Sequence, residues 1–92
     1  MKVKVKLLKP FSDIAGKGEV EIETKGETVN DALNDLCGVY PGLKKEIFEE
    51  SGEVTYSVNI FVNDRPISAL EDVNTRLKDK DEILIFMPVG GG

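Results

Sequence analysis

Two early segments of the chain alternate between apolar and charged positions. Residues 2–8 alternate, with Val3, Val5 and Leu7 on one side and the lysines at 2, 4 and 6 on the other. Residues 19–23 repeat the alternation with glutamates. A period of two residues predicts half-buried β-strands. Gly16-Lys17-Gly18 turns the chain between them. We therefore expect a hairpin in which the lysine face of one strand meets the glutamate face of the other.

The middle of the chain changes to helical spacing. Thr28 is followed closely by Asp31, a pattern typical of a helix start with an N-cap hydroxyl and an acid near the positive end of the helix dipole. Apolar residues between 29 and 36 then recur every three or four positions, and Tyr40 follows one turn later. Gly38 and Pro41-Gly42 are expected to end this helix. Residues 43–48 indicate a short second helical piece.

The last third returns to strand patterns. Residues 58–62 alternate, and Asn63-Asp64 predicts a turn after them. Leu70 and Leu77 are expected to fill the core from an irregular stretch around a short strand. Residues 82–87 are apolar at nearly every position, which is typical of a central strand, and Pro88 ends it. The order strand, strand, helix, strand, short strand, strand predicts an α+β domain with a mixed sheet.

Composition narrows the classes of function. The length of 92 residues fits one domain, and a net charge of −5 disfavours direct nucleic-acid binding, which depends on basic side chains. Without histidine, the chain lacks the side chain that titrates near neutral pH and the commonest metal ligand. Cys37 alone supplies neither a disulfide nor a metal site. We expect no enzyme, metal or cofactor, and the absence of a leader-like or long apolar run predicts a cytoplasmic protein without a membrane partner.

Four segments together resemble the β-grasp, or ubiquitin-like, fold. More narrowly, they are similar to the small subunit of molybdopterin synthase and its sulfur-carrier and archaeal modifier-like relatives. The segments are residues 3–16, 28–33, 58–64 and 77–92, the last ending Phe86-Met87-Pro88-Val89-Gly90-Gly91-Gly92. The resemblance implies a mixed sheet of four to five strands covered on one face by one main helix. It also implies a domain at 1–88 and a flexible tail at 89–92. Met87, where these carriers often have a second proline, and the extra Gly90 depart from the pattern.

The same resemblance implies that the C-terminus carries the function. An E1-like, ATP-dependent enzyme would adenylate Gly92, and a sulfur donor would convert it to a thiocarboxylate for molybdopterin synthesis. Gly90 and Gly91 would thread the larger subunit of molybdopterin synthase. Alternatives are a ubiquitin-like modifier that forms isopeptide bonds with lysines, a sulfur donor for transfer RNA, and a β-grasp binding module without tail chemistry.

Strand parity predicts a docking face for such partners. If Ile83 and Ile85 face the helix, Leu84 and Phe86 face away and lie near Phe61 on the neighbouring strand. An apolar patch without intrachain cover is typical of a protein interface. We therefore assign partner binding to five residues, namely Phe61, Leu84, Phe86, Pro88 and Val89.

Ordinary structural interpretations stay open for several of these features. Terminal glycines alone are typical of a flexible chain end. The lysines at 2, 4 and 6 fit a solvated strand face as well as a partner surface, and the glutamates at 49, 50 and 53 fit a solvated turn. Cys37 fits a half-buried helix position as well as a thiol that takes part in transfer.

Overall fold

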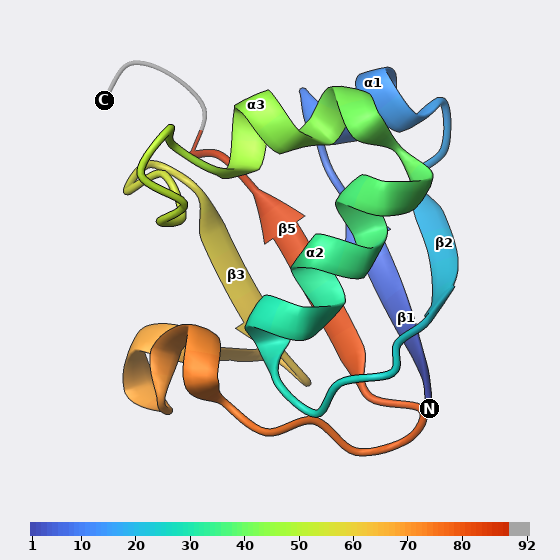
Figure 1. The fold of residues 1–92 in the computed structure, drawn as a ribbon, viewed down its shortest axis with the longest axis vertical. Helices are drawn as coiled ribbons and strands as arrows, with labels where there is room; N and C mark the ends of the chain where they lie inside the picture. The colour runs from blue at the N-terminus through green and yellow to red at the C-terminus, as the bar shows by residue number, and fades with distance from the viewer. Residues whose placement is uncertain (89–92) are drawn as a thin grey trace.

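The computed structural model describes residues 1–88 and shows a five-stranded mixed sheet crossed by one main helix (Figure 1). The strand order is β2-β1-β5-β3-β4, which confirms the predicted α+β, β-grasp architecture. The strands are β1 (Lys2–Leu7), β2 (Glu19–Glu23), β3 (Asn59–Val62), β4 (Arg65–Pro66) and β5 (Glu82–Phe86). The flexible tail predicted at 89–92 lies outside the described residues.

The predicted N-terminal hairpin is confirmed, with β1 and β2 antiparallel. Its register sets Lys4 opposite Glu21 and Lys6 opposite Glu19, so the lysine and glutamate faces meet as expected. The connection is more than a turn, because it contains a short helix, α1 (Phe11–Ala15). Phe11 is fully buried, and Gly16 ends the helix in the left-handed conformation at φ 76°, which glycine adopts without steric cost.

The β5 strand is central, as its composition predicts. It runs parallel to β1 and antiparallel to β3. Ile83 and Ile85 are fully buried in the core beneath the helices. At the far end of β3, Asn63 and Asp64 form a two-residue hairpin turn with φ 48° and 69°. Positive φ at both positions matches the twist of the flanking strands, and asparagine and aspartate tolerate it.

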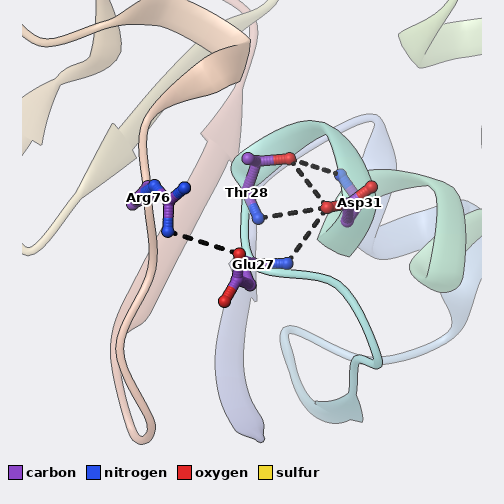
Figure 2. A network of polar contacts seen from close by, with 4 residues as sticks. All are labelled: Glu27, Thr28, Asp31 and Arg76. Carbon is purple, nitrogen blue, oxygen red and sulfur yellow. Dashed lines mark hydrogen bonds and ion pairs between the residues drawn. The ribbon is translucent and has the colours of Figure 1, made fainter.

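The main helix, α2 (Val29–Val39), begins at a capping box. Thr28 Oγ1 accepts a hydrogen bond from the Asp31 backbone N–H, while Asp31 Oδ2 accepts from the backbone N–H groups of Thr28 and Glu27 (Figure 2). A Cβ on Gly26 would overlap the Asp31 side chain, so the close approach requires glycine there. Arg76 Nη1 lies 3.3 Å from Glu27 Oε2 and links this corner to the segment that precedes β5, where Arg76 forms an isolated antiparallel bridge with Thr28.

The end of α2 differs from the prediction. Gly38 does not end the helix, which continues to Val39. A glycine costs a helix only about 0.5–1 kcal/mol, whereas Pro41 restricts the backbone of Tyr40, which lies at φ −123° and ψ 80°. Two short turns follow, η1 (Pro41–Leu43) and α3 (Lys44–Ile47), and confirm the predicted second helical piece. Leu43 and Ile47 are fully buried, and Phe48 is almost so.

The irregular stretch before β5 contains two further 3-10 turns, η2 (Ile67–Ala69) and η3 (Asp72–Asn74). Leu77 is buried and Leu70 packs against the core, as predicted. Within residues 1–88, no helix is both long enough and apolar enough to cross a lipid bilayer.

Candidate functional site

The face of the sheet that points away from α2 carries the predicted patch. Leu84 and Phe86 are only partly buried, in contrast to Ile83 and Ile85, so the parity prediction is confirmed. Leu84 pairs with Phe61 on one side and with Lys6 on the other. The Phe61 and Phe86 rings lie 5.6 Å apart between centroids at an angle of 45°. This tilted contact is a favourable aromatic geometry and holds the two rings in place.

The structure adds two residues to this patch that the sequence analysis missed. Leu8 follows Lys6 at the next same-face position, and its backbone N–H donates to the Ile85 carbonyl at 3.1 Å, so it lies beside the end of β5. Its side chain is 50% exposed. Pro66 pairs with Phe61 and shares its face. We call these five side chains the open sheet face: Leu8, Phe61, Pro66, Leu84 and Phe86.

Charged side chains border the open sheet face. Lys6 Nζ lies 3.1 Å from Glu82 Oε1, and Lys4 Nζ lies 3.8 Å from Glu19 Oε2. The hydrogen bond and charge of Glu82 raise the pKa of Lys6 above its ordinary value. Two of the three lysines at 2, 4 and 6 therefore have an acidic partner within the sheet, which fits the interpretation of a solvated strand face. Apolar contact is the main feature that this face offers a partner.

The tail leaves the domain next to this face. The β5 strand ends at Phe86, Met87 packs partly against the core, and Pro88 is exposed. The N-terminus lies at the opposite end of the molecule (Figure 1). Val89, Gly90, Gly91 and Gly92 lie outside the described residues, so their assigned roles stay predictions. Residues 86–88 therefore place the start of the tail beside an exposed apolar surface.

Other candidate groups carry no chemistry in the described part of the chain. Cys37 is 8% exposed in the last turn of α2, and burial raises the pKa of its thiol. A raised pKa disfavours the thiolate that nucleophilic or redox chemistry needs. Among residues 1–88, no group of three or more potential ligands is placed to hold a metal ion.

Two known proteins with similar sequences are informative. Small archaeal modifier protein 1 of Haloferax volcanii is 33% identical over 88 residues, covering 95% of this chain and 97% of that protein. A protein of Archaeoglobus fulgidus, provisionally named a sulfur carrier protein, is 32% identical over 92 residues and covers both chains fully. These relatives are small carriers or modifiers and not enzymes.

Solved structures agree with this assignment. Small archaeal modifier protein 1 from Methanosarcina acetivorans gives a TM-score of 0.88 at 42% identity, covering 99% of this chain and 96% of that one. A chain of the BexX/CysO complex of Amycolatopsis orientalis gives a TM-score of 0.81 at 28% identity, covering 98% of this chain and 99% of that one. A Pyrococcus furiosus protein is provisionally named molybdopterin converting factor, subunit 1. It gives a TM-score of 0.75 at 34% identity, covering 97% of this chain and 99% of that one.

The family model agrees with both comparisons and spans nearly the whole chain. It is described as the ThiS family and matches residues 5–92, a range that includes the open sheet face and the glycine tail. One family model therefore includes both the open sheet face and the terminal glycines. This chain belongs to the ThiS family, among the ubiquitin-like sulfur carriers and modifiers.

Proposed function

We propose that this chain carries sulfur on Gly92 for molybdopterin synthesis. The observation that supports it most directly is the position of the open sheet face beside the point where the tail leaves β5. The similarity to the Pyrococcus furiosus protein named above supports the pterin pathway in particular. The activating enzyme and the larger synthase subunit are the proposed partners.

The proposed chemistry begins at a poor electrophile. A C-terminal carboxyl group has a reference pKa of about 3.3–3.7 and is an anion at neutral pH. Attack of this carboxylate on the α-phosphate of ATP forms the Gly92 acyl-adenylate and releases pyrophosphate. Hydrosulfide then attacks the acyl carbon, AMP leaves with the bond electrons, and one proton is released to solvent. The product is a Gly92 thiocarboxylate that can pass its sulfur to a bound acceptor.

The dimensions of the tail fit this role. Four residues follow Pro88, and an extended chain spans about 3.3 Å per residue, so Gly92 reaches roughly 13 Å from the domain. Glycines pass through a narrow channel because they have no side chain. Ordering such a tail costs conformational entropy, so the domain must contribute binding energy through its own surface. The open sheet face is the surface proposed to do so.

Intact mass spectrometry tests the carrier role. The chain is incubated with ATP, an E1-like enzyme and a sulfide source, and we expect a mass gain equal to exchanging one oxygen for one sulfur. Deletion of Gly92 should abolish the gain, whereas Lys25→Ala, at the opposite end of the domain, should leave it intact. Absence of the gain with an enzyme that loads its own carrier would contradict the proposal.

A second candidate function is protein modification, which the similarity to small archaeal modifier protein 1 favours. In that reaction a lysine amine of another protein attacks the activated Gly92 and forms an isopeptide bond. Peptide mapping would show a lysine linked to Gly92. Thiolated transfer RNA as the product would instead identify the third alternative. A chain that keeps its activity after C-terminal extension would be a binding module.

A further inference from the structure

The segment between α3 and β3 exposes a large aromatic side chain shortly before β3 begins. Tyr56 is 94% exposed, the highest value among the large apolar side chains of the described residues. Its segment leads into Asn59, which pairs with Phe86 at the end of β5. Figure 1 shows this yellow-green segment beside the end of β5. Tyrosine is enriched among residues that dominate binding energy at interfaces.

A groove lies beside Tyr56 along the outer edge of β3. Its volume is about 290 Å³, and it runs between the segment that precedes β3 and the turns η2 and η3. Apolar walls come from Val54, Ile67 and Val73, while Ser68 and Asp72 contribute polar atoms. This size and lining fit one aliphatic or aromatic side chain with a cationic or hydrogen-bond-donating neighbour. The net charge of −5 also favours a partner with basic groups.

The groove and the open sheet face share one residue. Pro66 belongs to both, because it pairs with Phe61 on the face and also lines the groove. Asn59 likewise pairs with Phe86 and lines the groove. A partner that encloses Gly92 must approach within roughly 13 Å of Pro88, since the four tail residues reach no further. Such a partner passes close to the start of β3, where Tyr56 and the groove lie.

We propose that the adenylating enzyme makes a second contact here: Tyr56 packs on its surface, and one of its apolar side chains enters the groove. This inference rests on the proposed carrier function. The enzyme is the favoured occupant because it must capture the tail before any covalent bond holds it. An additional contact near the start of β3 would offset the entropy of ordering four residues.

The test uses the full chain with an enzyme that adenylates it, and measures kcat and KM from pyrophosphate release. Tyr56→Ala removes the exposed ring, and Ser68→Trp blocks the groove from an exposed position. We expect each to raise KM about tenfold with little change in kcat, as for lost ground-state binding. Val39→Ala and Asn34→Trp, both at exposed positions of α2, are matched controls and should leave KM unchanged.

The outcomes separate this inference from the proposed function. If Tyr56→Ala and Ser68→Trp leave KM unchanged while Leu84→Glu raises it, the groove contact is wrong and the carrier function stands. If the two variants instead impair only sulfur transfer to the acceptor, the surface faces another partner and the proposal is again overturned. If deletion of Gly92 leaves adenylation intact, the proposed function itself fails. Circular dichroism of each variant checks that the fold is retained.

Discussion

The two faces of β5 differ in what covers them, although consecutive residues supply both. Ile83 and Ile85 are fully buried beneath the helices, whereas Leu84 and Phe86 on the other face stay partly exposed. Both pairs are apolar, so hydrophobicity alone does not separate a core position from a docking position. Their neighbours do: the inner pair faces α2, whereas on the outer face Leu84 lies between Lys6 and Phe61, and Phe86 pairs with Asn59.

This difference indicates that the two faces of β5 have different roles. The inner face contributes folding free energy, and we propose that the apolar area of the outer face binds a partner. The hydrophobic effect is proportional to the area removed from water in either case. Substitutions on the inner face should therefore change stability, and substitutions on the outer face should change binding.

The largest expected effect comes from the inner face. Ile85→Ala removes buried methyl groups and leaves a cavity, so we expect a loss of about 2–5 kcal/mol in the free energy of unfolding. That is a large part of the roughly 5–15 kcal/mol typical of a small domain. Urea denaturation followed by circular dichroism measures it. A loss below about 1 kcal/mol would contradict the buried position of Ile85.

A substitution on the outer face should change binding more than stability. Leu84→Glu places a charge at the centre of the open sheet face, and we expect KM for adenylation to rise about thirtyfold, equivalent to roughly 2 kcal/mol of binding free energy. The free energy of unfolding should change by less than about 1 kcal/mol. Lys17→Ala, at an exposed position between α1 and β2, makes the net charge more negative by the same one unit and controls for that change. Equal effects of the two variants would point to long-range charge and not to local contact.

The sequence pattern was sufficient to assign the β5 residues to the two faces of the sheet, because side chains alternate between the faces along a strand. Once β5 was assigned as central, parity fixed which residues face α2. The same rule applied to the predicted strand at 2–8 places Leu8 on the face of Lys6, but the prediction assigned only lysines to that face. Pro66 could not be assigned, since its pairing with Phe61 depends on the turn at Asn63 and Asp64.

Two other features, the helix α1 and the groove beside Tyr56, left no pattern in the sequence from which they could be predicted. The helix α1 spans five residues, too few for a 3.6-residue period to appear, and it forms because Phe11 packs into the core. The groove beside Tyr56 joins segments that are distant in sequence, so only the fold brings its walls together. The start of α2 was predictable because Thr28 and Asp31 interact within one turn.

A smaller effect on stability is expected where α2 begins. Thr28→Ala removes the hydroxyl that accepts from the Asp31 backbone N–H at 3.2 Å, which should lower the free energy of unfolding by about 1 kcal/mol. Since α2 covers the inner face only, KM for adenylation should not change. Thr28→Ser keeps the acceptor and is the matched control. A rise in KM for Thr28→Ala alone would show that the two faces are coupled.

The smallest expected effect is the pH dependence of the same cap. Hydrogen bonds from the Glu27 backbone N–H, the Thr28 hydroxyl and the Thr28 backbone N–H hold the pKa of Asp31 below its ordinary value. A folded-state pKa that is depressed contributes stability above the unfolded pKa of about 3.9, and this stability is lost as the pH falls through the folded pKa. The wild-type chain should therefore be more stable than Asp31→Asn at neutral pH.

Denaturation of the wild-type chain and Asp31→Asn between pH 7 and pH 2 measures this difference. It should stay constant down to about pH 4 and then shrink as Asp31 becomes protonated in the folded chain. Asp35→Asn removes the same charge from the same helix and leaves the cap intact, so it isolates the capping contribution from the overall charge change. A difference that grows as the pH falls would mean that the carboxylate is not the form the cap stabilises. Loading of Gly92 by the activating enzyme at neutral pH should be equal in all three chains, because the cap acts on the covered face of the sheet and the proposed docking surface lies on the other.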